Sequence, residues 1–166
     1  NRKILESIED CFDAISHPSE EARLIELGDG AIIFLNDLDS AVELAVALGE
    51  RWRQVSEPIL DPNYIRQFRM GLTIDRVKMR VVPPWLSRIP RVQAAGPGIA
   101  LATRLQSQDL GSPGSILIDE FAATKLEPAN KARFSETVDI SYKDHEKGLV
   151  RLPEKGHVFR GENTLV

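Results

Sequence analysis

The tripeptide Gly28-Asp29-Gly30 constrains the fold of this chain more than any other feature, because it separates two short apolar runs. Residues 23–27 (RLIEL) precede it and residues 31–35 (AIIFL) follow it, and both runs are typical of β-strands. Two such strands joined by a glycine-rich turn predict a hairpin over residues 22–36. The glycines let the backbone bend and leave space for a bulky ligand beside it.

Asp29 has two interpretations at the tip of this hairpin. Asp-Gly is a common turn pair, so a plain turn explains the residue. Alternatively, a carboxylate that a rigid hairpin directs outward suits a metal ion bound to a phosphate, because Mg²⁺ and related ions prefer oxygen ligands. The tripeptide alone is compatible with both interpretations.

Composition and charge limit the classes of protein to which this chain can belong. The chain has 166 residues, of which 42% are hydrophobic and 28% charged, so we expect a single domain over residues 1–166. Its formal net charge of −4 provides no global positive field for nucleic acid, and we expect no membrane segment because no apolar stretch is long enough. Cys11 is the only cysteine, which excludes an internal disulfide and fits a cytoplasmic location.

Hydrophobic periodicity predicts the order of the other elements. Amphipathic helices are expected over residues 2–16, 38–55 and 98–108, a short helix over 119–126, and strands over 68–74 and 115–118. For the second helix, Ser40 and Glu43 have capping-box spacing, and Asp37 or Asp39 are alternative caps. Helices interspersed with strands predict an α+β fold, with a sheet, helices packed on it and a β-rich C-terminal tail.

Two segments are less regular. Pro83, Pro84 and Pro90 are incompatible with a long helix or a central strand, so residues 79–93 are expected to form an ordered loop. Beyond Ala132 the pattern predicts antiparallel strands with turns near residues 143–144 and 155–156.

Four segments, in this order, resemble the catalytic domain of class III nucleotidyl cyclases, the adenylate and guanylate cyclase family. The segments are the first helix, the hairpin over residues 25–34, the strand over residues 69–77 (RMGLTIDRV) and the helix and strand over residues 98–118. In the last segment, Ala102-Thr103-Arg104-Leu105 is similar to the family's Ala-Ala-Arg-Leu. The resemblance covers most of residues 2–126 and implies a ferredoxin-like core.

The resemblance also implies a reaction and a homodimer with active sites at its interface. A nucleoside triphosphate would be converted to a 3′,5′-cyclic monophosphate and pyrophosphate, with two Mg²⁺ or Mn²⁺ ions held by two aspartates of one protomer. Asp29 matches the second metal-binding aspartate, and Gly28 and Gly30 lie beside it. Arg104 matches the arginine that the partner protomer directs toward the developing charge.

Several positions depart from the family pattern. The family's first metal-binding aspartate lies in a strand before the first helix, so we expect that strand upstream of Asn1. Ala100 stands where the family has the transition-state asparagine, four residues before Arg104. The glycine of the family's central strand falls at Asp75, and the proline-rich segment is expected to replace the hairpin that usually follows.

The base-reading positions depart as well. Ile25 replaces the lysine of adenylate cyclases and offers no hydrogen bond to a base, whereas Gln93, at the second position, both donates and accepts. These residues are compatible with a pyrimidine substrate, UTP or CTP. In this respect the chain is similar to the compact bacterial pyrimidine cyclases of anti-phage signalling. The alternative hypothesis is a catalytically degenerate cyclase-like domain that serves in dimerisation or nucleotide sensing.

Overall fold

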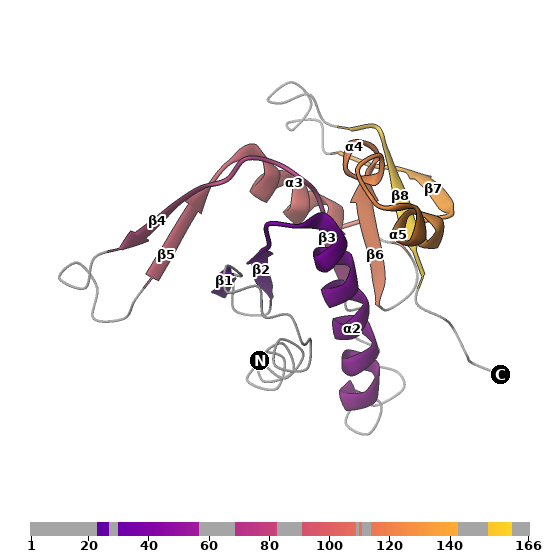
Figure 1. Ribbon diagram of the computed structural model, residues 1–166, viewed down its shortest axis with the longest axis horizontal. Helices are drawn as coiled ribbons and strands as arrows, with labels where there is room; N and C mark the ends of the chain where they lie inside the picture. The colour runs from indigo at the N-terminus through magenta and orange to yellow at the C-terminus, as the bar shows by residue number, and fades with distance from the viewer. Residues whose placement is uncertain are drawn as a thin grey trace.

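The computed structural model describes residues 23–26, 30–56, 69–82, 91–108, 110, 114–142 and 153–160, which form a mixed α and β protein (Figure 1). Its elements in chain order are β1 (Arg23–Glu26), β2 (Ala31–Phe34), α2 (Leu38–Ser56), β3 (Arg69–Leu72), β4 (Lys78–Val82), β5 (Arg91–Ala95), α3 (Pro97–Gln106), β6 (Ser115–Asp119), α4 (Glu120–Ala123), α5 (Pro128–Arg133), β7 (Glu136–Asp139) and β8 (Lys155–Phe159). None of the helices within these ranges is long and apolar enough to cross a membrane.

The described strands form one four-stranded sheet and two separate hairpins. The sheet has the order β3-β6-β8-β7, in which β3 and β6 are parallel and the other neighbours are antiparallel. β1 pairs with β2, and β4 pairs with β5, each as an antiparallel pair of its own. The arrangement agrees with the predicted α+β class, and the predicted C-terminal strands belong to the main sheet because β8 pairs with β6.

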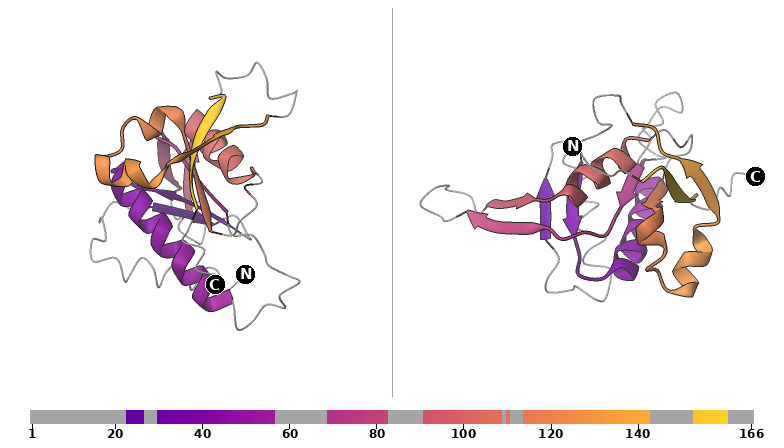
Figure 2. Two further views of the ribbon diagram at one scale, coloured as in Figure 1. Left: turned by 90° about the vertical axis from the view of Figure 1, so that its right-hand side faces the viewer. Right: turned by 90° about the horizontal axis from the view of Figure 1, so that it is seen from above.

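The core lies on both faces of the four-stranded sheet, with α2 on one face and α3 on the other (Figure 2). Ile116 and Ile118 of β6 pack with Val42 of α2, whereas Leu117 of the same strand packs with Leu105 of α3. Side chains of a strand alternate between faces, so Ile116, Leu117 and Ile118 must all be apolar to serve both clusters. All of its residues are buried, which makes β6 the central strand of the described fold.

α2 follows its predicted range closely, and the structure selects one of its candidate caps. The carboxylate of Asp37 accepts a hydrogen bond of 2.7 Å from the backbone N–H of Ser40, and hydrogen bonds from Ser40 lower the pKa of Asp37. Asp39 instead accepts a 2.8 Å bond from the side-chain amide of Asn130 and a 3.2 Å bond from the backbone of Glu127. Asp37 therefore caps α2, while Asp39 joins α2 to α5.

The expected loop over residues 79–93 is wrong, because β4 and β5 form a regular antiparallel ladder. The ladder runs from Lys78 opposite Ala95 to Val82 opposite Arg91. The three prolines do not interrupt it, since Pro83, Pro84 and Pro90 all fall in the connection between the strands, outside both of them. Proline is excluded from the paired strand and is compatible with the segment that joins two strands.

The C-terminal prediction also needs correction. Residues 155–156 were expected to form a turn, but they lie inside β8, and a Cβ at Gly156 would lie 2.8 Å from the Leu117 side chain. Gly156 thus allows β8 to pack closely against β6. In the sequence alone, such a glycine cannot be distinguished from one that marks a turn. The short helix expected over 119–126 ends at Ala123, and a second helix, α5, begins with Pro128 in its first turn.

We predict that Gly71→Ala destabilises the protein by about 3 kcal/mol, because α3 leaves no space for a methyl group on β3. A Cβ at Gly71 would lie 2.7 Å from the Leu105 side chain and 2.5 Å from the backbone N of Gln106, and it would also meet the carbonyl oxygen of Ala102. Urea unfolding measures the change.

The matched control is Gly30→Ala, where a Cβ would have no atom within 4 Å. Its free energy of unfolding should match that of the wild type. Equal stability of the two variants would contradict the close contact between β3 and α3.

Candidate functional site

The hairpin that carries the predicted Asp29 site is present. β1 and β2 pair with Ile25 opposite Ile32, which confirms the strands predicted on either side of the tripeptide. Gly30 directly precedes β2 and is half-buried, with open space where a side chain would begin. Gly28 and Asp29 lie outside the described residues, so the structure positions the strands that hold them and leaves their own placement a prediction.

The predicted Arg104 lies in the last turn of α3 and is half-buried. Its guanidinium donates a 3.0 Å hydrogen bond to the carbonyl oxygen of Ala100, which is exposed one turn earlier. Residues four positions apart share a helix face, so Arg104 and Ala100, where the resemblance implies an asparagine, are neighbours. Pro97 in the first turn of α3 sets where the helix begins, and with it the orientation of this face.

The two predicted base-reading positions lie on neighbouring strands. Ile25 is half-buried in β1, whereas Gln93 is exposed in β5 opposite Arg80. β1 and β5 contact each other, so the structure brings together the two elements that carry these residues. β5, which contains Gln93, is followed directly in the chain by α3, which contains Arg104.

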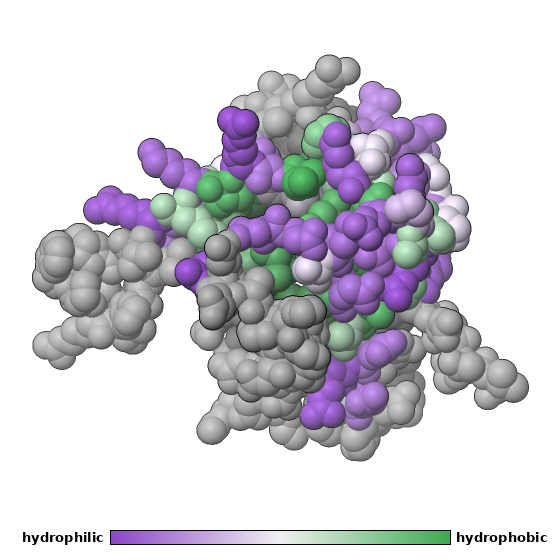
Figure 3. All heavy atoms as spheres, in the orientation of Figure 1, coloured by the Kyte–Doolittle hydropathy of each residue, from purple (hydrophilic) through white to green (hydrophobic). Residues whose placement is uncertain are grey.

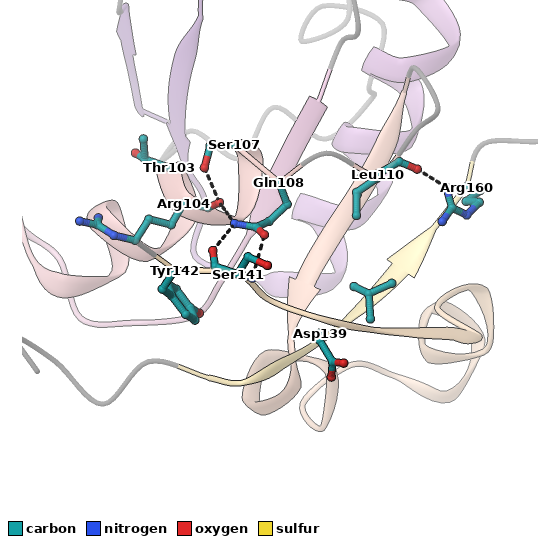
Figure 4. A pocket seen from close by; sticks show the side chains of 10 residues that line it. Thr103, Arg104, Ser107, Gln108, Leu110, Asp139, Ser141, Tyr142 and Arg160 are labelled. Atoms are coloured by element: carbon teal, nitrogen blue, oxygen red, sulfur yellow. Dashed lines mark hydrogen bonds between the residues drawn. The ribbon is translucent and has the colours of Figure 1, made fainter. Parts of the chain in front are cut away.

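An open pocket of about 800 Å³ lies beside Arg104, between the C-terminal half of α3 and the segment that follows β7 (Figure 4). Gln108 occupies its centre: its amide donates to the carbonyl oxygen of Ser141 at 3.0 Å and accepts from the N–H of Ser141 at 3.0 Å. Arg104 and Arg160 lie at opposite ends of the pocket. The other residues around it are Thr103, Ser107, Leu110, Val138, Asp139 and Tyr142.

Arg160, at the far end of this pocket, holds several elements together. Its guanidinium forms two hydrogen bonds of 2.6 and 2.7 Å with the carboxylate of Glu136 and another with the carbonyl oxygen of Leu110. The hydrogen bond from Arg160 lowers the pKa of Glu136, and the same bond raises the pKa of Arg160. This pair joins β7 to the end of β8. No sequence signal links residues so far apart, and the prediction missed them.

A second hollow, of about 150 Å³, separates β2 from β3. Residues 32–38 form one side and residues 71–75 the other, and α2 and α3 contribute Ala41, Gly98, Ile99 and Ala102. Among the described strands, β2 and β3 belong to different sheets, and each has one edge without a strand partner. The residues of β2 (AIIF) form a continuous apolar run, typical of a strand covered on both faces, yet all of them are only half-buried.

Within the described ranges, no group of three or more His, Cys, Asp or Glu side chains is arranged to hold a metal ion. Asp29, the expected ligand, lies outside these ranges. A carboxylate is a suitable ligand for Mg²⁺ or Mn²⁺, but a two-ion site needs more oxygen donors than Asp29 supplies.

No protein-family model matches this chain, and no curated protein is significantly similar to it. The function is therefore argued from the residues and their arrangement.

We predict that Glu136→Gln destabilises the protein at neutral pH and that the difference from the wild type disappears in acid. Because the pKa of Glu136 is lowered in the folded state, its contribution is complete above the ordinary glutamate value of 4.5 and is lost as the pH falls through the folded value. Urea unfolding at a series of pH values measures this difference.

Glu50→Gln, on the exposed surface of α2, is the control and should change stability little at any pH. A Glu136→Gln difference that persists unchanged in strong acid would show that the carboxylate charge is not what stabilises the contact with Arg160.

Proposed function

We propose that this chain is the nucleotidyl cyclase domain of a homodimer that converts a nucleoside triphosphate to a 3′,5′-cyclic monophosphate and pyrophosphate. The order of the described elements supports this proposal: a Gly-Asp hairpin, α2, β3, the β4–β5 hairpin, α3 and β6 follow one another as the resemblance implies. The β4–β5 hairpin strengthens the resemblance, since the family has a hairpin after its central strand and the sequence alone predicted its loss.

The observation that carries the proposal is the hollow between β2 and β3. Two strand edges border it, from the apolar β2 and from β3, which are both half-buried, and unpaired edges with apolar neighbours favour the addition of a strand. The resemblance places a central strand before the first helix, and that strand carries the first metal-binding aspartate. A strand in this hollow would join the β1–β2 pair to the four-stranded sheet. Its aspartate would supply the second metal-binding carboxylate, in addition to that of Asp29.

In this proposal, individual residues have separate roles in metal binding, phosphate binding and charge stabilisation. Bound Mg²⁺ or Mn²⁺ would activate the ribose 3′-hydroxyl and neutralise charge on the phosphates. The carboxylate of Asp29 would help to hold the metal ions, and the open space beside Gly30 leaves room for a triphosphate. The guanidinium of Arg104, from the partner protomer, would stabilise the charge that develops on the α-phosphate.

The base-reading positions favour a pyrimidine substrate. Ile25 has no hydrogen-bonding group for a purine edge, whereas the exposed amide of Gln93 presents one donor group and one acceptor. UTP and CTP are therefore the substrates we propose, and a product of this kind suits signalling in anti-phage defence in the cytoplasm.

One observation favours a second candidate function, a catalytically degenerate domain that binds a nucleotide or dimerises. The side chain of Ala100 is a methyl group on the exposed face that it shares with Arg104, and it cannot orient a ribose. This candidate predicts nucleotide binding without turnover.

Incubation of the protein with ATP, GTP, CTP or UTP and Mn²⁺, followed by separation of the products, tests the proposal. We expect cyclic UMP or cyclic CMP from the wild type, loss of product in Asp29→Ala, and a fall in kcat of about 10²- to 10³-fold in Arg104→Ala, as for other groups that stabilise a developing charge. The protein is assayed as it is naturally encoded, with any residues that precede Asn1.

Lys131→Ala, an exposed substitution on α5, is the control and should keep full activity. Nucleotide binding with no product from any triphosphate would favour the degenerate domain. Undiminished turnover in Asp29→Ala would exclude the proposed metal site.

A further inference from the structure

Gln108 lies at the centre of the pocket beside Arg104, between the end of α3 and the segment that follows β7 (Figure 4). Hydrophilic side chains cover much of the described surface in Figure 3, where water can satisfy their polar groups. Gln108 differs from them, because it is half-buried and the protein itself supplies hydrogen-bond partners for its amide.

The side-chain amide of Gln108 joins three backbone groups. Its nitrogen donates a hydrogen bond of 3.1 Å to the carbonyl oxygen of Arg104 and one of 3.0 Å to that of Ser141. Its oxygen accepts a bond of 3.0 Å from the N–H of Ser141. A glutamine amide carries two N–H donors, and these bonds use both of them. The amide therefore has no further donor for a bound ligand, and its role concerns the backbone groups that it joins.

One of these groups belongs to the helical turn that carries Arg104. Carbonyl groups in the last turn of a helix lack partners within the helix, and helix ends fray. Gln108 supplies a partner to the carbonyl oxygen of Arg104, and the hydroxyl of Ser107 donates to the same oxygen at 2.8 Å. From β3, the guanidinium of Arg69 donates a 3.4 Å bond to the carbonyl oxygen of Ser107. Of these three side chains, that of Gln108 joins the turn to the opposite wall of the pocket.

The segment to which Gln108 is bonded is held in place by other contacts. Ile140 is a buried member of the hydrophobic cluster that contains the core residue of α3, and Tyr142 packs against that cluster. The hydroxyl of Tyr142 also donates a 2.7 Å hydrogen bond to the carbonyl oxygen of Pro153. Ser141 lies between these two anchored residues, so its bonds with Gln108 limit how far the last turn of α3 can move.

We infer that Gln108 is a positioning residue for the reaction proposed above. Its amide fixes the last turn of α3 against residues 140–142, and thereby fixes the backbone from which the guanidinium of Arg104 extends beside the pocket. An arginine stabilises developing charge most effectively when its donors are already oriented, so a loosened turn would slow the chemical step. The inference rests on the proposed function, in which Arg104 is catalytic, and adds a residue to which the resemblance assigns no role.

Amide hydrogen exchange of the protein without nucleotide, followed by NMR spectroscopy, tests whether Gln108 holds the turn. In Gln108→Ala, the backbone N–H of Ser141 should exchange at least about tenfold faster, because its hydrogen-bond acceptor is lost. The N–H of Ser107 donates to the carbonyl oxygen of Thr103 at 3.1 Å within the last turn. It should also exchange faster in this variant, because the turn is released.

Steady-state kinetics, with the triphosphate that the wild type converts, tests the effect on the reaction. Gln108→Ala should lower kcat about tenfold and leave KM nearly unchanged, because Arg104 acts on charge that develops only in the transition state. The double variant Gln108→Ala/Arg104→Ala should be no slower than Arg104→Ala alone, since Gln108 acts through Arg104. A general loss of stability would instead lower kcat by the same factor in both backgrounds.

The matched control is Asn130→Ala, which removes another side-chain amide that joins two elements. Asn130 donates a 2.8 Å hydrogen bond to the carboxylate of Asp39 and so connects α5 with α2, whose residues do not line this pocket. We expect this variant to keep the wild-type kcat and the wild-type exchange rate at Ser107, whatever its stability in urea.

Three results would overturn the inference and leave the proposed cyclase intact. They are an unchanged exchange rate at Ser107 in Gln108→Ala, an unchanged kcat in that variant, and an equal fall in kcat with and without the Arg104 side chain. Absence of a cyclic product from the wild type, together with faster exchange at Ser107 in Gln108→Ala, would instead overturn only the proposed function and support the placement of the Arg104 turn by Gln108.

Discussion

The contact between β3 and α3 at Gly71 is the constraint on which the rest of the structure depends. The backbone of α3 from Ala102 to Gln106 approaches β3 so closely that no side chain fits at Gly71. That stretch of α3 includes Arg104, so the same contact that builds the core also sets the height of this arginine above the sheet. A substitution at Gly71 would therefore disturb both the packing of Leu105 against Leu117 and the position of the guanidinium.

Around this contact the described part of the molecule has two further features. The hollow between β2 and β3 has edges and apolar residues suited to a further strand, and the β4–β5 hairpin pairs with no other described strand. Arg104 follows the β4–β5 hairpin in the chain, on a helix that begins directly after β5. The arrangement suits a site that is completed by a second protomer, which is what the proposed reaction requires.

Local patterns predicted the elements whose signals lie within a few residues of each other. The hairpin around Gly28-Asp29-Gly30, α2, α3 and β6 were all predicted, because periodicity and turn residues act locally. The shared face of Ala100 and Arg104 also follows from helical spacing. The β4–β5 ladder was missed because its prolines occupy the connection, and Gly156 was misinterpreted because its role depends on Leu117, which is distant in sequence. The contacts of Gln108 with Ser141 and of Arg160 with Glu136 join residues with no local signal.

Complementation between two inactive variants tests the central claim most directly. If Asp29 and Arg104 act in one site but come from different protomers, a mixture of Asp29→Ala and Arg104→Ala forms heterodimers in which one of the two sites is intact. Such a mixture should recover about a quarter of the wild-type cyclase activity, since about half of the dimers are mixed. An active wild type whose two variants never restore activity to each other would contradict a site shared across a dimer.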